Sequence, residues 1–264
     1  MFATVAWPRQ FGAQIELAHP RDRGCWIKLS STRFYAYIAK MIDGFGRNID
    51  YLRISVTDRC NFRCTYCMPE QQSFLPHRDL LTYDEILILV ERFIAHGIRK
   101  IRLTGGEPLV RRDIHILIDA LGQHVRNGAL DELTMTTNGS RLEQFAPLLA
   151  SAGMKRINVS LDTLDADACR RISRGGDLDT ILAGIHAARA HGLDVKINMV
   201  ALKQQNEDAL LPMAHFCAEH GLDLTLIETM PLGAGVTERE ESYISLEDFT
   251  APLRAQYALH WYLL

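Results

Sequence analysis

The sequence predicts an α/β protein whose fold is a partial (β/α)6 TIM-like barrel. Two observations predict it. Six apolar strands alternate with helical stretches along residues 41–264, and no Gly-x-Gly-x-x-Gly loop of a dinucleotide-binding sheet occurs among them. Regular strand–helix alternation implies a parallel sheet with right-handed crossovers. No linker rich in Pro, Gly or Ser divides these residues, so we expect one domain there.

A local pattern marks the repeating units: a helical stretch ends in glycine, and an apolar strand follows. Strands are expected at 51–56, 101–104, 132–137, 157–160, 195–198 and 224–227. Helices are expected at 83–96, 112–125, 141–152, 178–191, 206–220 and 246–257. The terminating glycines are Gly97, Gly153, Gly192 and Gly221, and we interpret the histidines before three of them as helix caps. Thr82 with Glu85, and Ser245 with Asp248, predict capping boxes.

The composition is that of an ordinary globular protein, with 264 residues of which 47% are hydrophobic and 23% charged. A net charge of −3 gives no overall field that would attract nucleic acid or a membrane, so neither is expected as a partner. The six cysteines lack regular spacing, which favours a reducing compartment, and we expect a cytoplasmic protein. We interpret residues 1–40 as an atypical extension that is disordered or not native.

Cys60, Cys64 and Cys67 lie within eight residues, directly after the first expected strand. An odd, tight cluster does not fit a disulfide framework, and zinc sites usually have paired Cys-x-x-Cys units or a nearby histidine. Three thiolates from one loop suit an iron–sulfur cluster with one iron left open, which is typical of a reactive site. The loop lies at the carboxyl ends of the strands, where barrel enzymes keep their chemistry.

Polar and apolar residues alternate along the expected strands. The apolar set must meet the helices, so the polar set faces the barrel interior. This interior contains Arg53, Arg102 and Lys196, and unpaired buried charges are costly. We interpret it as a cavity for an anionic ligand such as a phosphorylated compound. The alternative, that these cations pair with Asp162 or Glu228 or face solvent, stays open on the sequence.

A second motif, Thr104-Gly105-Gly106-Glu107-Pro108, follows the second strand. Two glycines let the backbone approach a ligand closely, and Glu107 can accept hydrogen bonds from an ammonium group. The motif alone indicates only a turn. At the same rim as the three-cysteine loop, it becomes a specific signal of a functional site. Met230 closes the sixth strand, where a core methionine is the alternative interpretation.

Together these motifs resemble the radical S-adenosylmethionine (SAM) superfamily. The match extends to the GTP 3′,8-cyclase family within it, which acts in molybdenum cofactor biosynthesis. The blocks that carry this resemblance, in order, are residues 52–69, 102–113, 136–139, 157–162 and 195–198. The resemblance covers about residues 43–260 and implies a fold of the radical SAM type.

The resemblance implies a lyase that converts GTP to 3′,8-cyclo-7,8-dihydro-GTP. Cys60, Cys64 and Cys67 would hold one [4Fe–4S] cluster, whose open iron would bind SAM. The implied SAM-binding residues are Tyr66, Gly105, Gly106, Glu107, Ser160 and Met230. The implied GTP-binding residues are Arg53, Arg102, Thr136 and Lys196. A reductant protein is a further implied partner, and a homodimer is left open.

The chain also departs from the family pattern. The family has a second three-cysteine cluster in a C-terminal segment and a Gly-Gly tail, so we expect residues 41–264 to be the radical SAM core of a truncated cyclase. Thr225 stands where an arginine is expected, and Cys169 and Cys217 lack the spacing of a second cluster. The alternatives are a radical SAM enzyme acting on another anionic substrate or a peptide, and a non-catalytic protein that binds a cluster or a nucleotide.

Overall fold

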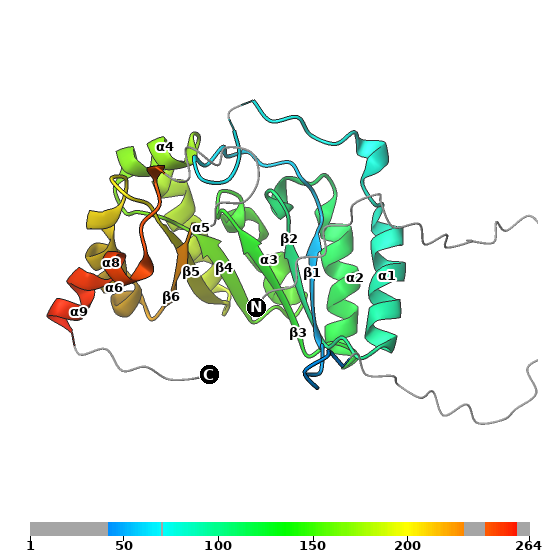
Figure 1. The fold of residues 1–264 in the computed structure, drawn as a ribbon. Helices are drawn as coiled ribbons and strands as arrows, with labels where there is room; N and C mark the ends of the chain where they lie inside the picture. The colour runs from blue at the N-terminus through cyan, green and yellow to red at the C-terminus, as the bar shows by residue number, and fades with distance from the viewer. Residues whose placement is uncertain (1–41, 70, 230–240, 258–264) are drawn as a thin grey trace, which may run out of the picture. The chain divides into compact units, whose positions relative to one another are not determined.

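Six parallel strands form one sheet in the computed structural model, in the order β1-β2-β3-β4-β5-β6 (Figure 1). The structure describes residues 42–69, 71–229 and 241–257, all within the unit Lys40–Leu264. The strands are β1 (Tyr51–Ser55), β2 (Lys100–Thr104), β3 (Glu132–Thr137), β4 (Arg156–Ser160), β5 (Asp194–Ala201) and β6 (Asp223–Glu228). The predicted parallel α/β fold is therefore confirmed, while the interpretation of residues 1–40 falls outside the described residues.

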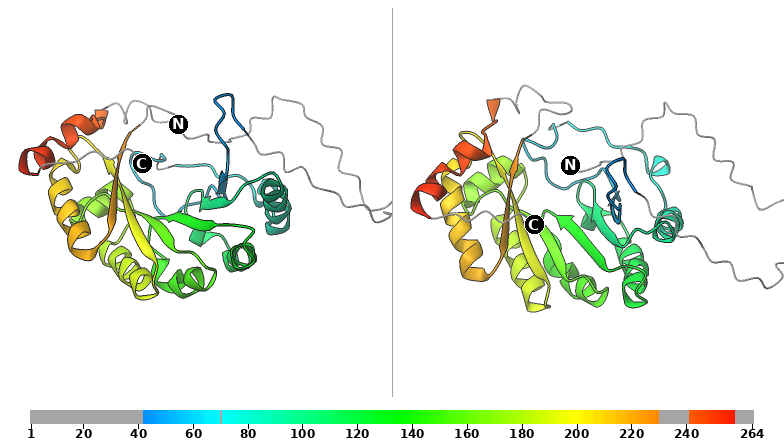
Figure 2. Two further views of the ribbon diagram at one scale, coloured as in Figure 1. Left: turned by 90° about the horizontal axis from the view of Figure 1, so that it is seen from below. Right: turned by 60° about the horizontal axis from the view of Figure 1, so that its bottom comes forward.

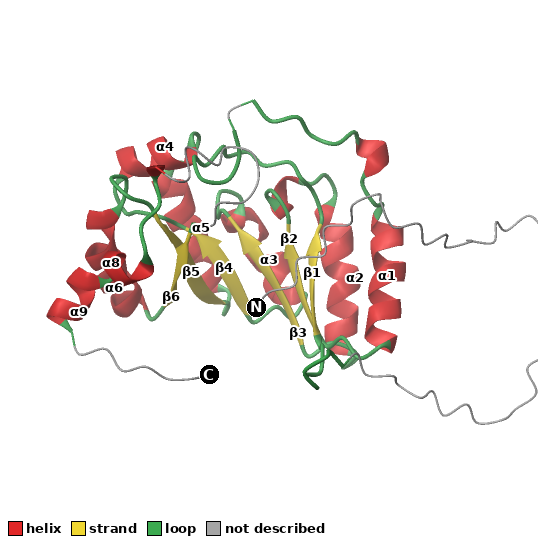
Figure 3. Ribbon diagram, viewed as in Figure 1, coloured by secondary structure: helices red, strands yellow, loops and turns green. Residues whose placement is uncertain are grey.

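Helices follow the strands and lie along the outer side of the curved sheet (Figure 2), as a separate layer (Figure 3). They are α1 (Tyr83–Ala95), α2 (Ile114–Arg126), α3 (Leu142–Ser151), α4 (Ala166–Ser173), α5 (Leu178–Ala190), α6 (Leu210–His220), α8 (Leu246–Phe249) and α9 (Ala251–Gln256). Short 3-10 turns occur at His77–Asp79, Pro108–Val110 and Glu207–Ala209. Within the described ranges, every helix is too short or too polar to cross a membrane.

The core lies between the outer face of the sheet and the helices. The apolar residues of the alternating strands are at most 3% exposed: Ile101, Leu103, Leu133, Met135, Ile157, Val159, Val195, Ile197 and Met199. Each such side chain contributes roughly 1.5–3 kcal/mol when it leaves water. They pack with buried helix residues such as Val90, Leu117 and Ile185. The predicted assignment of the apolar set to the helix-covered face is confirmed, which leaves the polar set on the opposite face.

The predicted helix ends are also found. Thr82 and Glu85 form a full capping box, with the Glu85 amide donating to the Thr82 hydroxyl at 3.2 Å and the Thr82 amide donating to the Glu85 carboxylate at 2.8 Å. Ser245 caps α8 by accepting the Asp248 amide at 3.1 Å. The four terminating glycines, Gly97, Gly153, Gly192 and Gly221, all have positive φ. Two of the preceding histidines, His191 and His220, contact helix carbonyls.

Two details differ from the sequence prediction. Helix α4 lies outside the six helical ranges given above; its short sequence is strongly charged and buries only one face through Ala168, Cys169 and Ile172. The helix expected at 246–257 divides at Thr250 into α8 and α9. Pro252 accounts for the break, because it has no amide hydrogen to continue the helical bonding.

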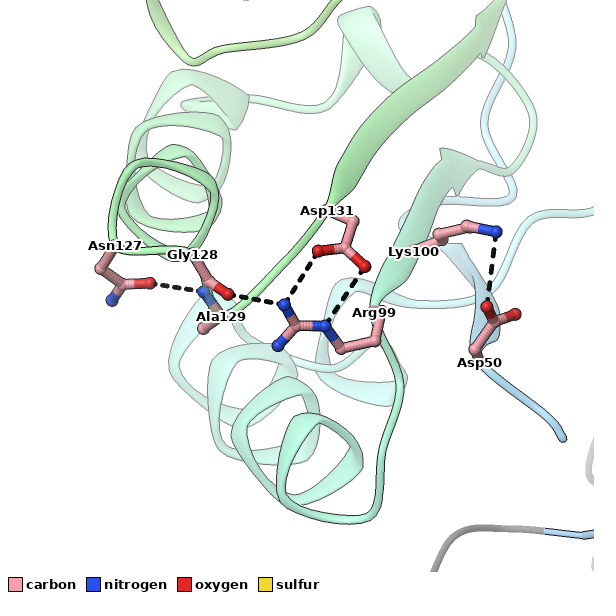
Figure 4. A network of polar contacts seen from close by, with 7 residues as sticks. All are labelled: Asp50, Arg99, Lys100, Asn127, Gly128, Ala129 and Asp131. Atoms are coloured by element: carbon pink, nitrogen blue, oxygen red, sulfur yellow. Dashed lines mark hydrogen bonds and ion pairs between the residues drawn. The ribbon is translucent and has the colours of Figure 1, made fainter.

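Ion pairs connect the amino-terminal ends of the first three strands (Figure 4). The Arg99 guanidinium donates to both carboxylate oxygens of Asp131, at 2.8 and 3.3 Å, and to the Gly128 carbonyl at 2.7 Å. Lys100 pairs with Asp50 at 3.4 Å. These contacts join the edge of the sheet opposite the cysteine motif, so they hold the scaffold without taking part in the site.

Candidate functional site

The cysteine loop, residues 56–69, follows β1 and crosses the carboxyl ends of the strands (Figure 1). Its backbone is held by the end of α4, since the Arg63 amide donates to the Ser173 carbonyl at 2.8 Å and the Thr65 amide donates to the Ile172 carbonyl at 2.9 Å. Phe62 is 5% exposed and anchors the loop in the core. Helix α4 therefore supports the loop that carries the three cysteines.

The three thiols of this loop influence one another. Cys60 and Cys64 are partly buried and Cys67 is exposed. Burial is the main cause that raises the pKa of both Cys60 and Cys64, and the nearby Cys67 raises each pKa further. The Cys60 sulfur accepts the Phe62 amide at 3.4 Å and the Asn138 side-chain amide at 3.8 Å. A positively charged group bound by these thiols would reverse this penalty and favour thiolates.

The donor chemistry of the three thiols, rather than their placement, fits an iron–sulfur cluster. Among the described residues, no three His, Cys, Asp or Glu side chains come close enough to hold one metal ion. Cys64 and Cys67 are separated by a tight turn, in which the Cys67 amide donates to the Cys64 carbonyl at 2.9 Å. In an iron–sulfur cluster each thiolate binds a different iron, so the sulfurs need not converge on one point. The purely thiolate donor set is also the set that such clusters use.

The Gly-Gly-Glu segment lies directly beneath this loop. The Gly106 amide donates to the Thr57 carbonyl at 2.7 Å, and the Glu107 amide donates to the Arg59 carbonyl at 2.8 Å. A β-carbon on Gly105 would lie 2.3 Å from the Thr57 oxygen, and one on Gly106 would lie 2.3 Å from the Arg59 oxygen. The close approach that we expected toward a ligand is therefore, in this structure, a close approach to the cysteine loop itself.

Glu107 joins the ends of β2 and β3 and is 0% exposed. One carboxylate oxygen accepts the Leu109 amide at 3.0 Å and the Thr137 hydroxyl at 2.8 Å. The other accepts the Asn138 amide at 2.6 Å. Burial raises the pKa of Glu107, and the three donors oppose that shift. These bonds take up three of the roughly four acceptor positions of a carboxylate, and the full burial of Glu107 directs it to the protein's own donors.

Tyr66, which is partly exposed, and the buried Asp162 form a pair between the cysteine loop and the end of β4. The Tyr66 hydroxyl donates to one Asp162 oxygen at 2.9 Å, and the Val200 amide donates to the other at 2.8 Å. Burial raises the pKa of Asp162 to about 6, although both donors oppose the shift. Asn206, 1% exposed, donates to the Asp162 carbonyl at 2.9 Å. Asp162 therefore holds Tyr66 in place.

A small cavity of about 30 Å³ lies against this pair. Its lining includes Cys64, Tyr66, Asn138, Ser160 and Asp162. It thus brings one of the three cysteines beside Tyr66 and Ser160, two of the residues expected to bind SAM. Met230, also expected there, lies outside the described residues.

The polar face of the sheet places the remaining predicted residues in rows, because paired strands put register partners side by side. Arg53 pairs with Arg102, and Arg102 pairs with Thr134. In the next row toward the carboxyl ends, Thr136 pairs with Asn158, and Asn158 pairs with Lys196.

A third row lies at the carboxyl ends of the strands, where Ser160 pairs with Asn198 and Asn198 pairs with Thr225. The residues expected to bind GTP therefore lie deeper in the barrel than Ser160 and the cysteine loop.

Of the alternative given above, pairing of the inward cations with Asp162 or Glu228 is not found among the described contacts, whereas the other part, a cation that faces solvent, is found for Arg53. Asp162 binds Tyr66 and Val200, whereas Glu228 accepts the Tyr243 hydroxyl and the Leu246 amide. Arg53 itself is exposed, and Arg102 and Lys196 are partly exposed. The polar face keeps its positive charge accessible.

Asn138 lies in the segment 136–139 noted in the sequence, whereas two further residues of this region, Asn206 and Arg156, were not singled out there. Asn138 contacts Cys60, and Asn206 fixes Asp162. Arg156 begins β4 on the polar face, two residues before Asn158. Its parity was visible in the sequence, whereas Asn138 and Asn206 carry no local signal beyond turn chemistry.

The radical SAM superfamily model matches residues 54–217, which include the cysteine loop and β2 to β5. The chain belongs to the radical SAM superfamily. This membership agrees with the three-cysteine loop at the carboxyl end of β1 and with the six parallel strands.

Curated relatives within this superfamily are similar over most of the chain. A GTP 3′,8-cyclase of Rhodopseudomonas palustris strain TIE-1 is 57% identical over 219 residues, which is 83% of this chain and 64% of the relative. A GTP 3′,8-cyclase of Agrobacterium fabrum is 53% identical over 221 residues, which is 84% of this chain and 63% of the relative. The radical SAM chain described here thus spans somewhat less than two thirds of these relatives.

Solved structures show the same fold at low identity. The crystal structure of Streptococcus suis SuiB bound to the precursor peptide SuiA has a TM-score of 0.66 and 19% identity, covering 78% of this chain and 46% of SuiB. Methylornithine synthase (PylB) has a TM-score of 0.59 and 16% identity, covering 77% of this chain and 61% of PylB. These likenesses support the radical SAM partial barrel as the fold.

Proposed function

We propose that this chain is the radical SAM core of a GTP 3′,8-cyclase, the enzyme that converts GTP to 3′,8-cyclo-7,8-dihydro-GTP in molybdenum cofactor biosynthesis. The observation that carries the proposal is the identity of 57% and 53% to two enzymes of that name, over 83% and 84% of the chain. The order of the polar rows supports it, because the cations expected to bind GTP lie directly below the rim that holds the cysteines.

The proposed cofactors are one [4Fe–4S] cluster and SAM. Cys60, Cys64 and Cys67 would hold the cluster, and their thiolate set and spacing fit it. When bound, these cofactors supply one-electron chemistry that generates a 5′-deoxyadenosyl radical from SAM. The electrons would come from a separate reductant protein.

The protein's own residues would position the reactants. Tyr66, fixed by Asp162, and Ser160 would contact SAM beside Cys64, and Glu107, buried between β2 and β3, would support this part of the site. Gly105 and Gly106 would act by allowing the loop to seat against β2. Met230 completes the proposed SAM set.

The anionic substrate would be held by the polar face. Arg53, Arg102 and Lys196 supply positive charge, and Thr136 supplies a hydroxyl, on β1, β2, β5 and β3 respectively. The phosphorylated part of the substrate would then lie on the polar face, deeper in the barrel than the cysteine loop.

A reconstitution experiment tests the proposal. The cluster is assembled anaerobically, reduced with dithionite, and given SAM with and without GTP, and 5′-deoxyadenosine and GTP-derived products are measured. We expect about four irons per chain and SAM cleavage that increases with GTP. Cys64→Ala should lose iron and cleavage, whereas Cys217→Ala, a buried cysteine of α6, should keep both.

Thr225 favours one alternative, because it lies on the polar face without the positive charge that the cyclase pattern has there. That alternative is a radical SAM enzyme for another anionic substrate or a peptide. SAM cleavage that is indifferent to GTP, and unchanged in Lys196→Ala, would support it over the cyclase. A loaded cluster that never cleaves SAM would instead indicate a non-catalytic binding protein. Lys203→Ala, an exposed lysine beyond β5, is the matched control.

A further inference from the structure

Arg156 extends the first polar row across a fourth strand. Arg53, Arg102 and Thr134 are register partners on β1, β2 and β3. The Thr134 hydroxyl donates to the Arg156 carbonyl at 2.8 Å, which places Arg156 beside Thr134 on β4. Arg156 shares its parity with Asn158 and Ser160, so it belongs to the same face. Three arginines therefore lie in one row across four adjacent strands.

This row carries more positive than negative charge. Glu132 accepts from the Arg156 guanidinium at 3.0 Å, with side chains 33% and 37% exposed. Burial is the main cause that lowers the pKa of Arg102, and the charges of Arg53 and Arg156 lower it further, while Tyr51 and Glu132 oppose them. The three guanidinium groups thus repel one another electrostatically, and the Glu132 carboxylate offsets part of this repulsion.

The next acidic residue along the row is already engaged elsewhere. Asp194, the register partner of Arg156 on β5, is ion-paired with Arg189 at 3.2 Å. The negative charge available to the arginine row within the described residues is therefore that of Glu132.

Two of these arginines have unused donors. The Nε atoms of Arg102 and Arg156 are buried and have no hydrogen-bond partner among the described residues. A buried N–H without an acceptor costs about 1–3 kcal/mol, so such groups normally have a partner. The Arg102 guanidinium lies over the Tyr51 ring at 5.5 Å, which fixes its direction. Both Nε atoms are closed to solvent, so an anion would be bound by the exposed parts of these guanidinium groups, which carry the excess positive charge.

The geometry points to Arg156 as a third polyphosphate-binding arginine, acting with Arg53 and Arg102 on the phosphate chain of the nucleotide. Adjacent strands are about 4.8 Å apart, so the row from β1 to β4 spans about 14 Å. Long arginine side chains can converge from these positions on a chain of phosphoryl groups, and the guanidinium fork suits phosphate oxygens. The polyphosphate site is inferred from the arginine row alone. That its ligand is GTP rests on the proposed function.

The alternative is a purely structural role, in which Arg156 only joins β4 to β3 through its ion pair with Glu132. The two roles predict opposite behaviour for the two partners of the ion pair. If Arg156 binds phosphate, removing the Glu132 charge leaves binding unchanged or tighter, whereas removing the Arg156 charge weakens it. If the pair is structural, both changes affect stability alike and neither affects polyphosphate affinity.

The test measures binding of inorganic tripolyphosphate, GTP and guanosine by calorimetry to the reconstituted protein with SAM. For Arg156→Gln we expect about tenfold or greater weakening for tripolyphosphate and GTP, since hydrogen bonds to charged groups contribute about 1.5–3 kcal/mol. Guanosine affinity should not change. Glu132→Gln should bind both phosphates at least as tightly as the parent. Arg170→Gln, an arginine of α4 with 66% exposure, is the matched control.

The outcomes separate the site from the proposed function. Unchanged tripolyphosphate affinity in Arg156→Gln, with loss in Arg102→Gln, overturns the role of Arg156 and leaves the cyclase proposal intact. Tripolyphosphate binding that depends on Arg156 without any GTP binding supports the site and contradicts the cyclase. Should Arg156→Gln not fold, Arg156→Lys keeps the charge but not the fork, and a several-fold loss of tripolyphosphate affinity is then the expected result, while no loss overturns the assignment.

Discussion

Gly106 and Arg59 approach each other so closely that a β-carbon on Gly106 would lie 2.3 Å from the Arg59 carbonyl oxygen. The contact joins the end of β2 to the cysteine loop, one residue before Cys60. The loop position therefore depends on the absence of a side chain at Gly106, which links a backbone requirement to the geometry of the metal ligands.

Gly106→Ala should displace the cysteine loop, because the obstacle is backbone and cannot rotate away. Overpacking of this kind costs about 1–3 kcal/mol. We expect reduced iron content and weaker cluster absorbance after reconstitution, with the secondary structure kept in circular dichroism. Gly44→Ala is the matched control, since nothing lies within 4 Å of its β-carbon. Equal iron content in Gly106→Ala and Gly44→Ala would contradict the role of this contact.

Glu107→Gln should destabilise the protein although it preserves size. The glutamine has one acceptor oxygen where the carboxylate had two, so its amide group would face either Asn138 or the Leu109 and Thr137 donors. We expect a loss of about 1–3 kcal/mol in the free energy of unfolding, measured in urea.

Glu143→Gln on α3 supplies the control, because that side chain is exposed and has no described hydrogen bond or ion pair. A Glu107→Gln variant as stable as Glu143→Gln would show that the buried carboxylate is not needed for the fold.

Local patterns predicted the scaffold, while contacts between distant residues escaped prediction. Alternation placed Ile101 and Val195 in the core because their strands have one face against helices. Gly97 and Gly153 ended helices because positive φ is a local requirement. The Tyr66–Asp162 bond joins residues 96 positions apart, and neither residue type signals its partner.

In the site, too, local patterns were predicted and contacts between distant residues were not. The parity of Arg53, Arg102 and Lys196 predicted one polar face, and the register of the strands agrees with it. The two glycines of Gly105-Gly106 were noted for close approach to a ligand, but only the structure shows that the cysteine loop occupies that space. A pair of glycines in a sequence can indicate a close backbone contact, but it does not indicate whether the partner is a ligand or another segment of the chain.

The Tyr66–Asp162 bond should be measurable by a double-mutant cycle. Tyr66→Phe leaves a buried carboxylate oxygen without its donor and should cost about 1–3 kcal/mol in unfolding free energy. Asp162→Asn changes the acceptor, and the double variant should lose less than the sum of the single variants. Because the two groups share one hydrogen bond, we expect a coupling energy of about 0.5–3 kcal/mol. Additive effects would show that Asp162 does not hold Tyr66.

The ion pair between Arg99 and Asp131 predicts a pH dependence far from the site. The hydrogen bond from Arg99 is the main cause that lowers the pKa of Asp131 below its ordinary value of 3.8. A lowered carboxylate pKa stabilises the fold above the ordinary value, and this contribution is lost as the pH falls through the folded pKa. Both side chains are about half exposed, so the effect on stability is small and weakens with salt.

Arg99→Gln should therefore raise the pKa of Asp131 toward 3.8, as measured by NMR titration of its carboxyl carbon. The urea midpoints of parent and variant should differ slightly near neutral pH and converge as the pH falls below about 4, where the unfolded-state carboxyl is protonated. Arg78→Gln is the control, because Arg78 is 86% exposed and its contact with Asp79 is long, at 3.9 Å. An Asp131 pKa that is identical in parent and Arg99→Gln would mean that this ion pair does not persist in solution.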